Sequence, residues 1–126
     1  MTSPLILIVE DNEKNMKLVR DVLMVKGYRT LEAVTGEDGV RLAAEHVPTL
    51  VLMDIQLPGI SGIEALRQLR ADPKTASIPV IAVTASVMAS DRRNITDAGF
   101  DGYVGKPLNL REFLDAVAAA VAPRQA

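Results

Sequence analysis

The sequence predicts an α/β protein in which five helices cover both faces of a doubly wound, five-stranded parallel sheet. Short apolar runs alternate along the chain with segments of helical period, a pattern typical of a sheet buried on both faces. Hydrophobic residues make up 48% of the chain and aromatic residues 3%, so the core must consist mainly of aliphatic side chains. The 126 residues suffice for one domain, and we expect residues 1–126 to form a single domain.

Five short runs rich in apolar residues are the expected strands. The second run is more polar than the others, which places it at an edge of the sheet. Each of the other four runs ends next to a residue with a reactive side chain. The expected strands are residues 5–9, 28–34, 50–53, 80–83 and 103–105.

The first two helices have recognisable ends. The first follows Asp11 and ends at Lys26-Gly27, a basic last turn followed by a capping glycine. The second begins after Thr35, an N-cap with Asp38 three residues later, and ends before Pro48. The side chains expected to face the core are Met16, Val19, Val22 and Leu23 in the first helix, and Val40, Ala43, Ala44 and Val47 in the second.

The remaining helices follow the third, fourth and fifth strands. Ser61 and Glu64 have the spacing of a capping box, as do Asn109 and Glu112, so a helix should begin at each place. Between them, residues 88–98 are expected to form a weaker, more polar helix. The side chains expected to face the core are Ile63, Leu66 and Leu69, then Ile95 and Ala98, and finally Leu110, Leu114, Val117 and Val121.

The strand order follows from the reactive residues at the strand ends. If the polar second strand lies outside the first, the order is 2-1-3-4-5, the flavodoxin-like arrangement, and the first and third strands lie about 4.8 Å apart. Ligands of such sheets bind outside the carboxyl ends of the strands. The order therefore brings Glu10, Asp11, Asp54 and Thr84 into one crevice.

Three carboxylates in one crevice call for a cation. Each pair repels by about 4 kcal/mol at a separation of about 4 Å and an effective dielectric near 20. Mg²⁺ fits, with Mn²⁺ as a substitute, because it binds a few carboxylate or carbonyl oxygens and keeps several waters. We expect Asp11 and Asp54 to bind the metal directly, the backbone carbonyl of Gln56 to be a third ligand, and Glu10 to act through water.

Asp54 is the candidate phosphoryl acceptor. Lys106, after the fifth strand, would meet the anionic centre from the side opposite the metal, and Thr84 would supply a hydroxyl donor. An aspartate in these surroundings is suited to accept a phosphoryl group as an acyl phosphate, because the transfer needs mainly alignment and neutralisation of charge. Taken singly, Asp54 fits a turn aspartate and Lys106 a surface lysine. Together, at the ends of their strands, they indicate a functional site.

Four motifs together resemble the receiver domain of two-component response regulators, over essentially the whole chain. They are Val9–Asn12, Leu52–Gly62, Val83–Ala85 and Lys106-Pro107. Residues 10–18 and 53–58 are most similar to the single-domain regulators of the cell cycle within that family. The resemblance implies a bacterial cytoplasmic protein of a phosphorelay, in which a sensor histidine kinase or a histidine phosphotransferase supplies the phosphoryl group.

The resemblance also implies roles for individual residues. Lys106 and Thr84 would contact the phosphoryl group, and Tyr103 would change rotamer as Thr84 moves, although a half-buried strand aromatic is an equally good reading of Tyr103. The Lys106-Pro107 peptide bond would be cis. Gln56 and Ser86 hold the positions at which family members vary the access of hydrolytic water, so they would tune the lifetime of the phosphoryl group.

The expected output is binding to another protein. The resemblance and the absence of an output domain imply that phosphorylation switches a surface on the fourth helix, fifth strand and fifth helix. Val87-Met88 is either core or part of that surface. We expect no catalysis beyond the protein's own phosphorylation and dephosphorylation. His46, the single histidine, is expected to be solvated, so the phosphohistidine must come from another molecule.

Other classes of protein fit the sequence less well. A haloacid-dehalogenase-type phosphatase needs a second acid where Gln56 stands, and a nucleotide or flavin site needs a glycine-rich loop where residues 10–13 carry acids. Pro107 after Gly105-Lys106 excludes a P-loop. The net charge of −2 argues against nucleic-acid binding, the absence of cysteine excludes disulfides, and no apolar run is long enough to insert into a membrane.

Overall fold

The computed structural model, which describes residues 3–85, 89–106 and 108–122, confirms the predicted sheet. Its strands are all parallel, and their order is β2-β1-β3-β4-β5, so the polar β2 lies at one edge. The strands are β1 (Leu5–Val9), β2 (Arg29–Ala33), β3 (Leu50–Asp54), β4 (Val80–Thr84) and β5 (Gly102–Gly105).

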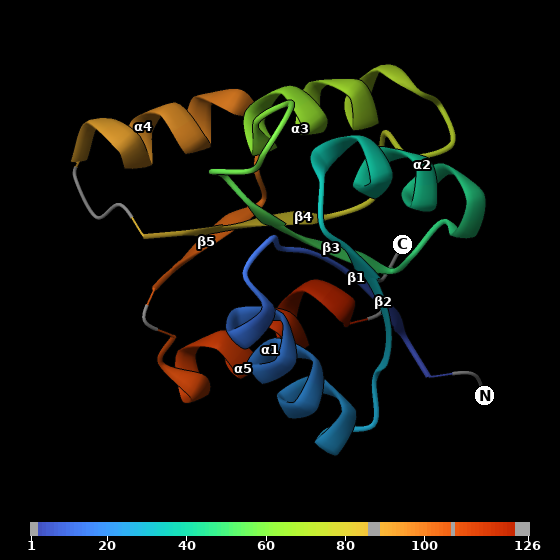
Figure 1. Cartoon of the computed structure of the whole chain (residues 1–126), viewed down its shortest axis with the longest axis vertical. Coiled ribbons are helices and arrows are strands. Elements are labelled where there is room, and N and C mark those ends of the chain that lie inside the picture. The colour runs from blue at the N-terminus through green and yellow to red at the C-terminus, as the bar shows by residue number, and fades with distance from the viewer. Residues whose placement is uncertain (1–2, 86–88, 107, 123–126) are drawn as a thin grey trace.

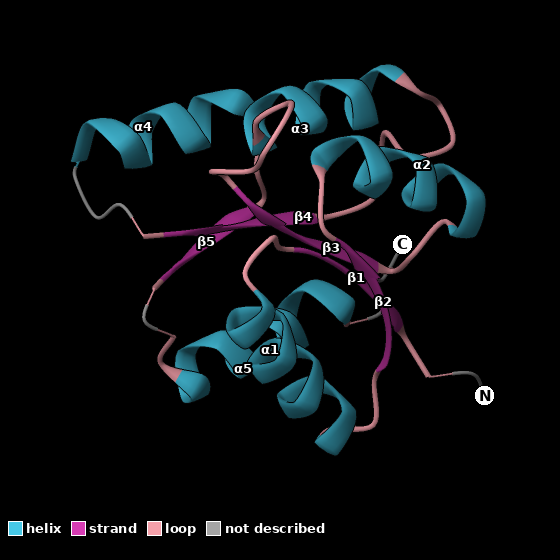
Figure 2. Ribbon diagram, in the orientation of Figure 1, coloured by secondary structure: helices cyan, strands magenta, loops and turns pink. Residues whose placement is uncertain are grey.

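Helices cover both faces of the sheet. Figure 1 shows α2, α3 and α4 on one face and α1 and α5 on the other, and Figure 2 shows the strands between these two layers. Within the described residues, no helix has the length and apolar character needed to cross a membrane. The helices are α1 (Glu13–Val25), α2 (Gly36–His46), α3 (Gly62–Ala71), α4 (Ala89–Ala98) and α5 (Leu110–Val121).

The core consists of two apolar layers, one on each face of the sheet. Alternate residues of β1 serve the two layers, because successive side chains of a strand point to opposite faces. Leu7 and Val9 pack in the cluster that includes Leu66 of α3, whereas Ile6 and Ile8 pack with Phe113 of α5. Both faces of the central strands are therefore buried, which explains their continuous apolar sequence.

The predicted helix starts are confirmed by their capping hydrogen bonds. The side chains of Thr35, Ser61 and Asn109 each accept a hydrogen bond from the backbone N–H three residues later, at 3.1, 3.2 and 3.1 Å. Asn12 caps α1 in the same way, with its Oδ1 3.0 Å from the backbone nitrogen of Asn15. Such caps satisfy N–H groups that the first turn of a helix leaves unpaired.

Two predictions about the core face are wrong. Val47 is 53% exposed, because it is the C-cap of α2 and adopts a left-handed conformation with φ of 45°, which turns it out of the helical stripe. Leu110 is 44% exposed because it begins α5, whereas Phe113 is completely buried and was not predicted. The inward face of α5 is therefore centred on Phe113 and Val117.

Candidate functional site

The reactive residues meet at the carboxyl edge of the sheet. Asp54 is the last residue of β3 and pairs in register with Val83, while Thr84 ends β4 and pairs with Gly105. Glu10 follows β1, and its backbone nitrogen donates to the carbonyl of Ala33, at 3.0 Å. The parallel register therefore delivers side chains from β1, β3, β4 and β5 to one place, as the sequence predicted.

Asp54 is buried and held from two directions. Its side chain lies on the central strand β3, and the whole residue is 6% exposed. The backbone N–H of Gln56 donates to Oδ1 at 3.1 Å, and the ammonium group of Lys106 donates to Oδ2 at 3.1 Å. Both carboxylate oxygens of Asp54 are thus fixed before any ligand binds.

Lys106 joins the two buried carboxylates of the site. Its Nζ lies 2.8 Å from Oε1 of Glu10, closer than it lies to Asp54. The backbone N–H of Lys106 donates to the carbonyl of Thr84 at 2.9 Å, which extends the β4–β5 pairing and orients the lysine towards the site. The other oxygen of Glu10, Oε2, accepts a hydrogen bond from the backbone N–H of Asn12 at 3.2 Å.

Burial and charge pairing shift the pKa values of two groups. Burial raises the pKa of Glu10 above its usual value, and the neighbouring Asp54 adds to the increase, although Lys106 and the Asn12 N–H oppose it. Burial alone would lower the pKa of Lys106, but its hydrogen bonds and charge pairing with Glu10 and Asp54 outweigh burial and raise it. Lys106 is therefore a firmly protonated cation between two acids.

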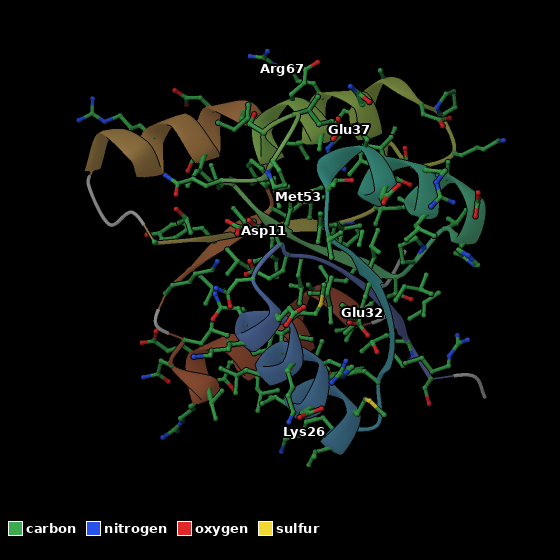
Figure 3. All side chains as sticks on the ribbon, in the orientation of Figure 1. Asp11, Lys26, Glu32, Glu37, Met53 and Arg67 are labelled. Atoms are coloured by element: carbon green, nitrogen blue, oxygen red, sulfur yellow. The ribbon has the colours of Figure 1, made fainter. Side chains whose placement is uncertain are left out.

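Three carboxylates form a cluster that could hold a metal ion. One oxygen from each of Glu10, Asp11 and Asp54 can be chosen so that all three lie within 4.8 Å of one another. Asp11 is exposed and lies at the end of β1 between the two helical layers (Figure 3), whereas the other two are buried. A set of hard oxygen donors with one solvent-facing member suits a divalent cation that retains bound water, as Mg²⁺ does.

The other predicted residues lie around this cluster or outside the described residues. Thr84 is buried at the end of β4, and Tyr103 on β5 is 42% exposed. The side chain of His46 is 46% exposed at the end of α2, as expected for a solvated residue. Three expectations fall outside the described residues: the tuning role of Ser86, the placement of Val87-Met88, and a cis peptide bond before Pro107.

A hollow borders the site on the side of Glu10 and Lys106. It has a volume of about 410 Å³, and most of its walls are apolar. Glu10 and Lys106 are its charged lining residues, so the hollow meets the site at the ion pair between them. The lining residues are Glu10, Asn15, Leu18, Val19, Val83, Ala85, Lys106 and Leu108.

The glycines that support the loop after Asp54 were not predicted from the sequence. A Cβ at Gly62 would lie 2.3 Å from the backbone oxygen of Asp54, so glycine is needed where α3 approaches β3. At the loop tip, Gly59 has φ of 75° and lies against the Glu37 carboxylate, which also accepts a long 3.5 Å hydrogen bond from Ile60. The Pro58-Gly59 turn and the second glycine at 62 were the available signals.

Comparison with known proteins gives a consistent result. The family model described as response regulator receiver domain matches residues 6–118. DivK of Brucella ovis, a polar-differentiation response regulator, is 45% identical over 112 residues, which are 89% of this chain and 91% of that protein. DivK of Brucella anthropi has the same identity and coverage. The resemblance to response regulators predicted from residues 10–18 and 53–58 is confirmed, since both of these relatives are DivK response regulators.

Solved structures agree with this comparison. The receiver domain of a sensor histidine kinase from Pseudomonas aeruginosa is 32% identical, with a TM-score of 0.89, covering 96% of this chain and 99% of that one. That structure contains a magnesium ion coordinated in its active-site cleft. The chemotaxis protein CheY4 of Vibrio cholerae has a TM-score of 0.87 over 94% of this chain and 98% of that one, and at 19% identity it shows the shared fold.

Proposed function

The chain belongs to the receiver-domain family of response regulators, and we propose that it is a single-domain regulator whose Asp54 accepts a phosphoryl group from a phosphohistidine. The observation that carries this proposal is the Lys106 ammonium group bridging Glu10 and Asp54, beside a cluster of three carboxylates. A lone buried aspartate would not need this arrangement. Asp54 is the acceptor because it combines a central position with fixed carboxylate oxygens.

The acidic cluster is the proposed metal site. Asp11 and Asp54 would bind Mg²⁺ directly, with Mn²⁺ as a substitute, and the carbonyl of Gln56 would be a third ligand. Glu10 would act through water, which agrees with its present pairing to Lys106 at 2.8 Å. When bound, the metal would neutralise charge on the phosphoryl oxygens. The magnesium ion in the Pseudomonas aeruginosa structure supports this assignment.

In the proposed transfer, an oxygen of the Asp54 carboxylate forms a bond to phosphorus. The bond between phosphorus and the donor imidazole breaks, and its electron pair stays on the imidazole nitrogen, so the product is an acyl phosphate. Lys106 provides a fixed positive charge next to the acceptor, which would stabilise the negative charge on the phosphoryl oxygens in the transition state. The hydrogen bond from the Gln56 N–H keeps the carboxylate from rotating during the attack.

Phosphorylation would then change the surface that binds a downstream protein. Thr84 would hydrogen-bond the new phosphoryl oxygens through its hydroxyl, and Tyr103, exposed on the edge strand β5, would change rotamer with it. The partner surface is formed by α4, β5 and α5, and one of its two states binds the partner more tightly. Gln56 and Ser86 would set how long that state lasts, by controlling the access of water.

The partners follow from the same reasoning. A sensor histidine kinase or histidine phosphotransferase would donate the phosphoryl group, with its imidazole approaching Asp54 at the carboxyl edge of the sheet. We place the protein in the bacterial cytoplasm, where such donors act, with neither a nucleic acid nor a membrane as its target. The protein would catalyse its own phosphorylation and dephosphorylation and no other reaction.

Incubation with acetyl phosphate and Mg²⁺ tests the proposal. Intact-mass spectrometry should reveal one labile phosphoryl group per chain, in amounts that fall when EDTA removes the metal. Asp54→Ala should lose the modification, whereas Asp115→Ala, which removes an exposed aspartate of α5, should retain it. Turnover of many equivalents of acetyl phosphate without a modified protein would indicate a phosphatase instead. Unchanged labelling of Asp54→Ala would refute the proposal.

A further inference from the structure

A second charged cluster lies at the edge of the sheet opposite Asp54. Arg70, in the last turn of α3, and Asp101, just before β5, form an ion pair of 2.8 Å in which the arginine side chain is 28% exposed. Val80, the first residue of β4, lies beside this pair, whereas Thr84 at the other end of β4 belongs to the phosphoryl site. The cluster therefore belongs to neither the metal site nor the hollow beside it.

Arg70 makes contacts to two separate segments. Its Nη1 donates to the backbone carbonyls of Ala76 and Ile78, at 3.0 and 2.6 Å, in the loop between α3 and β4. Its Nη2 donates to the carbonyl of Gly99 at 3.4 Å and to Oδ2 of Asp101 at 2.8 Å, in the loop between α4 and β5. The planar guanidinium group has the fixed fork of donors that such an arrangement requires.

Asp101 continues the connection into the sheet. Its backbone N–H donates to the carbonyl of Val80 at 2.8 Å, and its Oδ2 accepts a hydrogen bond from the Val80 N–H, also at 2.8 Å. Asp101 thus both donates a hydrogen bond to Val80, the first residue of β4, and accepts one from it. Gly99, with φ of 105°, ends α4 only two residues earlier, so the end of α4 is tied to α3 and β4 through this short loop.

We propose that Arg70 is a positioning residue that keeps the C-terminal end of α4 and the start of β5 fixed in both states of the switch. This inference rests on the proposed function of the α4–β5–α5 surface. In the proposed switch, the conformational change begins at Thr84, at the other end of β4. Because the C-terminal end of α4 is held in place, α4 can change its position only by pivoting about residues 99–101. The phosphorylation-dependent change is therefore confined to the part of the partner surface near Asp54.

Arg67 provides a matched control for Arg70. It lies one turn earlier on α3, and it carries the same charge. Its side chain is 71% exposed, points outward (Figure 3), and pairs with Glu64 of the same helix at 3.4 Å. Arg67→Gln therefore removes the same charge from the same helix without affecting the loops that Arg70 holds. Any effect of Arg70→Gln beyond that of Arg67→Gln reflects the anchor.

Backbone amide hydrogen exchange, followed without and with beryllofluoride and Mg²⁺, tests the anchor. In the wild-type protein, exchange near Thr84 and in β5 around Tyr103 should change with beryllofluoride, while residues 99–101 change by less than about twofold. In Arg70→Gln, residues 99–101 should exchange at least about tenfold faster and should become sensitive to beryllofluoride. Arg67→Gln should behave like the wild type. Exchange in α1 reports any general loss of stability.

Each outcome has a defined meaning. If residues 99–101 of the wild-type protein already respond strongly to beryllofluoride, or if Arg70→Gln speeds exchange equally in α1, the anchor is refuted. If beryllofluoride changes no region of the wild type, the proposed switch fails instead. Should Arg70→Gln not fold, Asp101→Asn keeps an oxygen for the Val80 N–H and removes the charge that Arg70 binds. This variant should again release residues 99–101, and normal protection there would refute the anchor.

Discussion

Replacing Gly62 with alanine would insert a methyl group between the start of α3 and the backbone that carries Asp54. The new Cβ would lie 2.3 Å from the carbonyl oxygen of Asp54 and 2.9 Å from the Cα of Ile55. Both neighbours are backbone atoms of a buried strand and its first loop residue, so neither can rotate away. Gly62 also donates its N–H to the Ile55 carbonyl at 2.9 Å, a bond that the displaced helix would lengthen.

The structure sets the size of the effect. Overpacking a rigid site costs roughly 1–3 kcal/mol, and contact with backbone on both sides places this case at the upper end. Alanine recovers about 0.5–1 kcal/mol because it is a better helix former than glycine. We therefore expect Gly62→Ala to lower the free energy of unfolding by about 2–2.5 kcal/mol. Because Asp54 itself is displaced, its rate of phosphorylation should fall by about tenfold or more.

Urea denaturation and labelling with acetyl phosphate measure the two effects of Gly62→Ala. Gly102→Ala is the control, because a Cβ there would lie 3.9 Å from Ile81 Cγ1, an ordinary contact distance. The control should retain its labelling rate and lose less stability than Gly62→Ala. The reasoning would be wrong if Gly62→Ala unfolded at the wild-type urea concentration and accepted phosphoryl groups at the wild-type rate.

Two further changes test the core and the electrostatics of the site. Phe113 is fully buried, so Phe113→Ala should lower the free energy of unfolding measured in urea by about 3–5 kcal/mol. A loss below about 1 kcal/mol would contradict the assignment of Phe113 to the core. The pKa of Glu10 is raised above 4.5 in the folded protein, so the folded state binds the proton more tightly than the unfolded state does. In EDTA, the free energy of unfolding of the wild type relative to that of Glu10→Gln should therefore fall as the pH rises from 4.5 through the folded pKa. If the wild type instead became more stable relative to Glu10→Gln over this pH range, the pKa of Glu10 would not be raised by folding.

The helix starts and the meeting of the acidic residues could be predicted because the relevant signals are local or set by strand order. The capping residues Thr35, Ser61 and Asn109 act within one turn, so their helix starts could be predicted without tertiary information. The meeting of Glu10 and Asp54 required only that their strands be parallel neighbours, and the polar second strand fixed that order.

What the sequence did not predict depends on contacts between distant segments. In α5, apolar residues occupy both 110 and 113, and only packing against the sheet decides that Phe113 faces inward. Val47 adopts a left-handed conformation that its side chain gives no reason to expect. Arg70 and Asp101 are 31 residues apart, so no local pattern indicates that they bind each other.

The most direct test of the account is to locate the phosphoryl group on the chain. Borohydride reduces an aspartyl phosphate to homoserine, which peptide mass spectrometry identifies at a single residue. After incubation with a phosphorylated histidine phosphotransferase and Mg²⁺, homoserine should occur at position 54. Homoserine at Asp11 or at another carboxylate, or an acid-labile phosphate on His46 with no homoserine, would contradict the central claim that the site prepares Asp54 as the acceptor.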